Sequence, residues 1–293
     1  LKSYALWGDK SNFLTRPTIK EVKKMDTDLL MEQIKEAMAV ETSVFYTGTL
    51  GKNIVKNAVS EKLIINKSLK KSNSPLRWEK KLKKSNTVYF YNDKKAVQSQ
   101  VNILVDGGVM NLKDRHKSNV FNKYFGGSMS GLVFQEIREF KSLAYSAWGS
   151  YRSPYYLDDS GRFEGFIGTQ ADKTINAIET YVQLLKDMPE KPLRADGIRS
   201  GLLESLNSSK PRFRGMSLSI RGWEKQGYVS DPRKTKKNVY SDVEFEDIKE
   251  FYSNYIKGKP LIITVVGNKD KIDMEKLSKF GEVIEVKKED IFN

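Results

Sequence analysis

Arg138 and Tyr145 are the side chains in this sequence whose types and spacing could do chemistry. Both lie in "GLVFQEIREFKSLAYSAW" (131–148), a pattern typical of a helix that runs into a strand. A guanidinium and a phenolic hydroxyl are both hydrogen-bond donors, so they could converge on a peptide carbonyl and stabilise negative charge that develops there. The spacing alone favours a plainer arrangement, with Arg138 as a solvated helix residue and Tyr145 as a half-buried strand aromatic.

Other polar groups are weaker candidates for a site. The loop "GGSMSG" (126–131) could approach a ligand closely through its glycines, but no "GK[ST]" follows, so it is not a phosphate loop. A helix–helix turn with Ser130 as an N-cap is the simpler expectation. His116 lies among charged residues on an expected helix and is predicted to be a surface residue. Asp158 and Asp159 are expected in a hairpin turn.

The composition excludes several kinds of site. The chain has 293 residues with no cysteine and one histidine. Disulfides and thiolate chemistry are therefore absent, and a zinc site needs three or four ligands that usually include at least two His or Cys. We therefore expect that this chain binds no zinc by itself. The sequence also contains no nucleophile elbow, serine triad or dinucleotide-binding fingerprint.

The net charge of +14 is concentrated in one stretch. Residues 51–95 hold 13 Lys/Arg against 3 Asp/Glu, and the densest part, "NKSLKKSNSPLRWEKKLKKSN" (66–86), favours a solvated connector over a phosphate-binding patch. Aromatic residues beside it could stack on bases, but Tyr89 and Tyr91 should share one face of a strand and Phe90 the other, as in a core strand. A basic nucleic-acid-binding module is an alternative, and the partners that we expect include no nucleic acid.

The sequence gives no sign of a membrane segment. No apolar run approaches 18 residues, so no membrane span is expected, and no signal peptide can be recognised. The first residue is Leu1 rather than Met, which suggests a fragment. We expect a soluble chain, and the sequence leaves its compartment open.

Apolar periodicity and turn residues predict the helices and strands that would position these residues. Residues 1–19 are expected to be irregular. Two antiparallel hairpins are expected, one from 87–92 and 98–108 and one from 144–153 and 161–170. The other expected strands are 43–48, 260–267 and 282–288, and the expected helices are 20–38, 52–64, 111–125, 131–141, 171–188, 194–228 with a break near Pro211, 243–257 and 270–280. Helices grouped with hairpins predict an α+β fold, an antiparallel sheet covered by helices.

The two ends of the chain resemble each other. Each has a helix, then a strand that ends in glycine (Gly48 and Gly267), then another helix. A repeat this long has the size of a whole domain. We therefore expect residues 1–65 to be the C-terminal tail of a preceding repeat, 66–85 a basic linker, and 86–293 a complete repeat.

The segment "FGGSMSGLVFQEIREFKSLAYSAWGSY" resembles the second-half repeat of the pitrilysin/insulinase family of zinc metallopeptidases, which includes the mitochondrial processing peptidase subunits. In that family a helix ends in "REK-x-x-LaY", and the matching residues here are Arg138, Glu139, Leu143, Ala144 and Tyr145. "VEFEDIKEFYSNYIKGKPLIITVVGNKDKI" and "YALWGDKSNFLTRPTIKEVKKMDTDLL" resemble the closing segments of the family's repeats. The resemblance covers nearly the whole chain.

This resemblance implies a pitrilysin-like repeat in which an antiparallel sheet is covered by helices, and two halves that enclose a chamber. The family's zinc motif, HxxEH, is absent here, so the chain is similar to the C-terminal, non-zinc half. Zinc is then expected in an N-terminal half, on the same polypeptide or on a partner subunit. The other expected partner is a peptide substrate.

The resemblance also implies roles for two residues. Tyr145 would donate to the oxyanion that forms as zinc-bound water attacks, and Arg138 would hold the substrate carbonyl or backbone nearby. The resulting hypothesis is the substrate-binding, chamber-closing portion of a zinc metalloendopeptidase that hydrolyses peptides, inactive on its own. The alternative is a catalytically inactive, peptidase-like interaction or scaffolding subunit.

Overall fold

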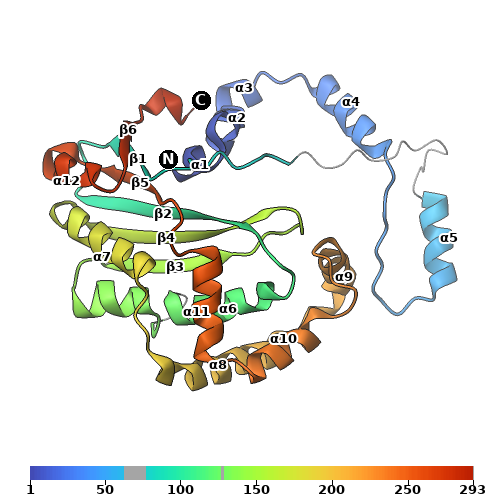
Figure 1. Cartoon of the computed structure of the whole chain (residues 1–293). Coiled ribbons are helices and arrows are strands. Elements are labelled where there is room, and N and C mark those ends of the chain that lie inside the picture. Colours follow the sequence, from blue (N-terminus) through green and yellow to red (C-terminus); the bar gives the residue numbers. More distant parts are fainter. Residues whose placement is uncertain (63–76, 127–128, 293) are drawn as a thin grey trace.

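The computed structural model describes residues 1–62, 77–126 and 129–292, and a six-stranded sheet forms the centre of this part of the chain (Figure 1). The strand order is β3-β4-β2-β5-β1-β6. The strands are β1 (Thr87–Asn92), β2 (Gln98–Val109), β3 (Ser146–Arg152), β4 (Ser160–Gln170), β5 (Ile262–Gly267) and β6 (Glu282–Glu285). The expected α+β class is confirmed.

The predicted pairing of β1 with β2 is wrong, because β5 lies between them. β5 runs parallel to β1, with Thr87 opposite Ile262, and antiparallel to β2, with Val101 opposite Val265. β6 runs parallel to β1 on its other side. The sheet is therefore mixed rather than wholly antiparallel. Alternating apolar residues identify a strand but not its neighbour, and β1 is buried on both faces, as an interior strand must be.

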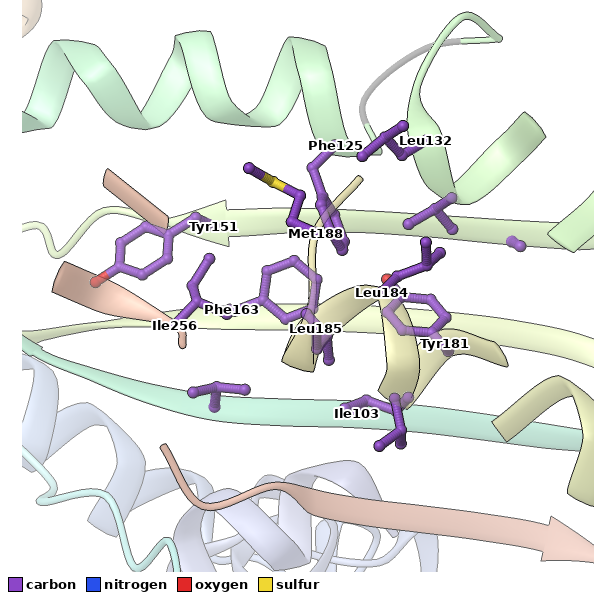
Figure 2. Packing of buried hydrophobic residues seen from close by; sticks show 14 of the residues in the cluster. Ile103, Phe125, Leu132, Tyr151, Phe163, Tyr181, Leu184, Leu185, Met188 and Ile256 are labelled. Carbon is purple, nitrogen blue, oxygen red and sulfur yellow. The ribbon is translucent and has the colours of Figure 1, made fainter. Parts of the chain in front are cut away.

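One face of the sheet is covered by helices, and the main core lies between them and the strands. Figure 2 shows Phe125, Phe163 and Tyr181 packed in this layer. The covering helices include α6 (Asp114–Phe125), α7 (Thr174–Lys186), α8 (Ala195–Ser208) and α11 (Phe245–Tyr255). The predicted hairpin of β3 with β4 is confirmed by their antiparallel register.

Two glycines that face each other in this hairpin make room for a buried tyrosine. Gly149 lies opposite Gly165 in the register of β3 and β4. A Cβ atom would lie 2.5 Å from the Tyr181 hydroxyl oxygen if added at Gly149, and 2.6 Å from it if added at Gly165. The hydroxyl donates a hydrogen bond to the Trp148 carbonyl at 2.8 Å. The ring of Tyr181 therefore ties α7 to the edge strand β3.

The first residues are helical rather than irregular, and they cover part of the opposite face of the sheet. They form α1 (Lys2–Trp7), a short 3₁₀ turn and α2 (Asn12–Thr15). Ala5 and Leu6 are buried in a second apolar cluster with Tyr89 and Ile262. The tyrosine lies in this cluster while Phe90 lies in the main core, as expected from alternation. Each of these helices is too short to show a 3.6-residue period in the sequence.

Residues 19–62, here called the arm, extend away from the sheet (Figure 1). They contain α3 (Ile19–Val22), α4 (Thr27–Met38) and α5 (Lys52–Lys62). The single helix predicted at 20–38 is divided, because Asp26 caps the start of α4 by accepting from the Asp28 N–H at 2.8 Å. The predicted helix at 52–64 is confirmed as far as Lys62, and its last residues lie outside the described ones.

The buried strand predicted at 43–48 is wrong. These residues form no strand, and their apolar side chains are exposed. A strand needs a neighbour to satisfy its backbone groups, and no strand of the described sheet lies beside this segment. The arm contacts the rest of the chain at α9 (Met216–Lys225), where Thr47 and Ser217 are hydrogen-bonded at 3.1 Å and Arg221 lies over the ring of Phe45.

The expected helical region at 194–228 is confirmed as α8 and α9 with a break between them. The helix α10 (Pro232–Ser241) was not expected, because its charged sequence hides the apolar period. Asp231 as N-cap and Pro232 as first helical residue were the available signals. The last helix is α12 (Met274–Ser278). None of the helices in the described ranges is long and apolar enough to cross a membrane.

The basic connector is only partly described, since residues 63–76 lie outside the described ones. Most residues of its described part are exposed, as expected for a solvated connector, and several of its side chains contact the rest of the protein. Arg77 forms an ion pair with Asp158 at 2.7 Å, and Lys80 donates to the hydroxyl of Ser160 at 2.8 Å. Both partners belong to the turn and first residue of the β3–β4 hairpin, where Asp158 was expected.

Candidate functional site

Arg138 lies on η2 (Phe134–Phe140), a π-helical segment within the helix expected at 131–141. π-Helical turns are rare and often occur at functional sites. Ile137 is fully buried and fixes the segment against the core, whereas the next side chain, Arg138, is 40% exposed. The buried residue therefore presents its neighbour to the surface.

The backbone between Arg138 and Tyr145 is fixed by three local features. The Leu143 N–H donates to the Ile137 carbonyl at 2.9 Å, and Ser142 takes a positive φ of 49°. A residue in this left-handed conformation commonly ends a helix. The buried hydroxyl of Thr169, on β4, donates to the Leu143 carbonyl. The turn that separates the two candidate residues is thus held by both the helix and the sheet.

The structure brings Arg138 and Tyr145 together. The guanidinium carbon of Arg138 lies 5.5 Å from the centre of the Tyr145 ring and 4.8 Å from that of Phe134, both within cation–π range. Tyr145 is 83% exposed, so the expectation of a half-buried aromatic is wrong. Its N–H donates to the Gly168 carbonyl at 3.1 Å, which places it directly before β3. Two adjacent donors are therefore presented to the outside of the domain.

The strand that follows Tyr145 is an edge of the sheet, and α6 covers its far end. The side-chain oxygen of Asn122 accepts from the Tyr151 N–H at 2.6 Å, and its amide nitrogen donates to the Tyr151 carbonyl at 3.0 Å. An amide side chain thus replaces a neighbouring strand and blocks further pairing there. At the other end of β3, Ser146 is exposed beside Tyr145. The candidate pair lies at this exposed end.

The "GGSMSG" loop precedes η2, and its residues 127–128 lie outside the described ones. The described Met129 is 78% exposed. The carbonyl of Ser130 accepts from Arg194, at the start of α8, at 2.9 Å. This contact joins the loop to α8, and the N-cap role of Ser130 stays a prediction.

His116 is a buried residue rather than the predicted surface one. It is 2% exposed, and its ring stacks on Tyr228 with 5.6 Å between centroids. Burial, together with the charges of Lys236 and Arg115, lowers the pKa of His116 from 6.5 to about 4. The available signal was its place four residues before the buried Val120 on the same face of α6.

The buried neutral imidazole should make stability depend on pH. In the unfolded chain His116 takes up a proton near pH 6.5, but in the folded protein only near its lowered pKa of about 4. The contribution of neutral His116 to the free energy of unfolding is therefore fully present above pH 6.5, and it is lost as the pH falls toward 4. Between pH 7 and pH 5 the wild type should lose about 2 kcal/mol more unfolding free energy than His116→Phe. Urea unfolding at both pH values measures this difference, and equal losses would contradict it.

Residues 1–62, 77–126 and 129–292 contain no group of three or more His, Asp or Glu side chains placed to hold a metal ion. The donor groups of the described chain therefore do not fit a zinc ion. We assign no reaction step to a metal bound here.

Comparison with known proteins identifies relatives in both sequence and fold. Residues 53–196 match the family described as the peptidase M16 inactive domain. A Bacillus subtilis protein named "uncharacterized zinc protease YmxG" is 40% identical over 102 residues, which are 34% of this chain and 22% of that protein. This chain thus spans less than a quarter of that relative.

Two solved structures share the fold at low sequence identity. The peptidase M16 inactive domain from Pseudomonas fluorescens has a TM-score of 0.65 and 14% identity, and the match covers 92% of this chain and 65% of that one. The ferredoxin protease FusC, in complex with Arabidopsis ferredoxin, has a TM-score of 0.61 and 11% identity, and the match covers 87% of this chain and 28% of that one. At these identities the likeness concerns the fold alone. The sequence match identifies residues 53–196 as part of an inactive domain of the peptidase M16 family, as the resemblance to the pitrilysin/insulinase peptidases predicted, and the shared fold agrees with it.

Proposed function

We propose that this chain is the substrate-binding, chamber-closing portion of a zinc endopeptidase, and that Arg138 and Tyr145 contact the peptide. The observation that supports this is their pairing at the exposed end of edge strand β3, with 5.5 Å between the guanidinium carbon and the ring centre. Donors that act on a substrate must be fixed before it binds. Here Ser142 and Thr169 fix the turn between them.

The two side chains have separate tasks in this proposal. A zinc-bearing half supplies the metal that activates the attacking water. The hydroxyl of Tyr145 donates to the peptide oxygen on which negative charge develops, and Arg138 holds a neighbouring carbonyl through its guanidinium N–H groups. Tyr145 is highly exposed in this chain, so its donor is accessible to a substrate that lies between the halves. Enclosure then excludes water and strengthens both contacts.

A polypeptide substrate is supported by the relatives. YmxG is named a zinc protease, and FusC is a ferredoxin protease solved with a bound ferredoxin. Each name describes that protein alone. We extend the polypeptide substrate class to this chain because of the shared domain. Since this chain holds no zinc ligand set in its described part, the proposal requires a second, zinc-bearing half.

We further propose that residues 1–65 are the tail of a preceding repeat, 66–85 a linker, and 86–293 a complete repeat. The arm supports this division of the chain, because many of its apolar side chains are exposed. A groove of about 390 Å³ runs along α5 with an almost wholly apolar lining. Exposed apolar surface of this kind marks contact sites. The arm side chains concerned include Leu29, Leu30, Met31, Ile34 and Ile54. We assign this surface to contact with the zinc-bearing half.

Reconstitution tests the proposal. The chain alone should not cleave a fluorogenic peptide, and adding the zinc-bearing half should produce cleavage that a chelator abolishes. Hydrogen exchange of the α4 and α5 amides should slow when the halves combine, because the arm becomes covered. A stable complex that cleaves nothing, with an intact zinc site in the other half, would instead support the inactive interaction subunit.

A further inference from the structure

A pocket of about 320 Å³ lies between α6, α8 and α10, apart from the Arg138–Tyr145 pair. Lys123 and Lys236 line it, and no carboxylate does so among the described residues. Its other polar lining includes the hydroxyls of Ser205, Ser209 and Tyr240. Two lysines and three hydroxyl-bearing residues thus line one small space, and no acidic residue of the described chain lines it.

The stem of Lys123 lies across α8. A Cβ atom added at Gly201 would lie 3.3 Å from the Cε atom of Lys123 and 3.7 Å from its Nζ atom. Because glycine has no Cβ, the lysine can approach the backbone of α8 closely. Its ammonium group is therefore held between α6 and α8. Within the described ranges, Lys123 forms no ion pair with any carboxylate.

Lys236 points from α10 toward α6. Burial lowers the pKa of Lys236, and its charge contributes to the lowered pKa of His116 inside the helix layer. Asp231 is the acidic group that acts on Lys236, but Arg233 already holds both oxygens of that carboxylate, with Nε contacts of 3.0 Å and 2.9 Å. The ammonium of Lys236 is therefore partly desolvated and has no carboxylate of its own in the described chain, so a bound anion would stabilise its charge.

Tyr240 adds a directed donor. Its hydroxyl oxygen accepts from the amide of Asn119 at 2.9 Å, so its own hydrogen remains for another acceptor. Tyr240 is 4% exposed and is held by the packing of α10. The pocket thus combines two lysine side chains with one fixed hydroxyl donor.

We propose that this pocket binds the phosphate group of a small molecule. A phosphate dianion matches two ammonium groups, whereas a carboxylate would neutralise only one of them. Lysine binds phosphate as a point charge, and hydroxyl groups supply the remaining hydrogen bonds. The pocket has room for a phosphate with a small organic group attached, but it is a local hollow between helices rather than a groove that could follow a nucleic-acid backbone.

The single histidine of the chain reports on this pocket by NMR, because no other imidazole signal is present. In a chloride buffer at constant ionic strength, inorganic phosphate and O-phosphoserine are added separately to the full chain. Saturable shifts of the His116 ring signals are expected, since the bound anion offsets the charge of Lys236. Tighter binding of inorganic phosphate identifies the free anion as ligand, and tighter binding of O-phosphoserine identifies a phosphomonoester.

Variants of the lining lysines test whether phosphate binds in this pocket. Lys123→Met and Lys236→Met should each weaken phosphate binding about tenfold or more, because each removes a charged contact. Lys237→Met is the matched control, since that lysine is exposed on the same helix α10 and does not line the pocket. Methionine keeps the aliphatic stem and removes a partly buried charge, so the variants should melt no lower than wild type, and Lys236→Gln offers a second check. Non-saturable shifts, or equal affinity in the pocket variants and the control, would overturn the proposal.

Discussion

Replacing Tyr145 by phenylalanine is expected to lower kcat for peptide cleavage about 10²–10³-fold when the chain acts opposite a zinc-bearing half. The change removes one hydroxyl and keeps the ring that lies 5.5 Å from the Arg138 guanidinium carbon. The loss should appear in kcat more than in KM, because the oxyanion forms only as the reaction proceeds. Steady-state kinetics on one fluorogenic peptide provides both constants.

Tyr155→Phe is the matched control for this experiment. Tyr155 is also exposed, but it lies beyond the other end of β3 in the hairpin connection. Its loss of a hydroxyl should leave kcat unchanged. If Tyr145→Phe also kept the wild-type kcat while Arg138→Ala did so too, the proposed roles of the pair would be wrong.

Replacing Tyr181 by alanine is expected to lower the free energy of unfolding by about 3–5 kcal/mol. The ring is fully buried between α7 and the β3–β4 hairpin, and its hydroxyl bonds the Trp148 carbonyl at 2.8 Å. Removing it creates a cavity and leaves that carbonyl without this donor. Urea unfolding followed by circular dichroism measures the loss.

The glycines opposite this ring provide an internal check. Gly165→Ala should cost about 1–3 kcal/mol in the wild type, because the new methyl group would lie 2.6 Å from the Tyr181 hydroxyl oxygen. In the Tyr181→Ala background the same change should cost little, which a double-mutant cycle detects. Gly168→Ala on the same strand is the control, since its Cβ would meet no atom closer than 3.6 Å. Equal costs for Gly165→Ala in both backgrounds would refute the account of close packing.

The sequence identified most elements of the fold but not how all of them pair. The apolar period of the sequence was sufficient to predict α7 and the β3–β4 hairpin, whose strands are close in the chain. It could not predict which strands pair with β1, because the neighbours β5 and β6 come from the other end of the chain. It also failed at 43–48, where strand-forming residues have no neighbouring strand in the described sheet. Strand formation depends on a partner as well as on local preference.

The candidate site was recognisable by its residues but not by its geometry. Arg138 and Tyr145 belong to a recognisable sequence motif, but the contact between them depends on features that sequence patterns do not encode. π-Helical turns change the direction in which Arg138 points, and a serine rarely adopts the positive φ seen at Ser142. Likewise, Lys123 and Lys236 are ordinary surface lysines in the sequence, and only the packing of α6, α8 and α10 brings them to one pocket.

The position of β1 between β5 and β6, which come from the end of the chain, determines when the domain can fold during synthesis. The side-chain oxygen of Asn86, just before β1, accepts from the Leu261 N–H, which lies 175 residues later. At ~5–20 residues per second, the ribosome needs roughly 9–35 s to add that length. During this time β1 and the β5-facing side of β2 have no partner, and their unpaired backbone groups are open to aggregation. A chaperone that binds apolar β-strands therefore has its longest opportunity at residues 87–92 of this nascent chain.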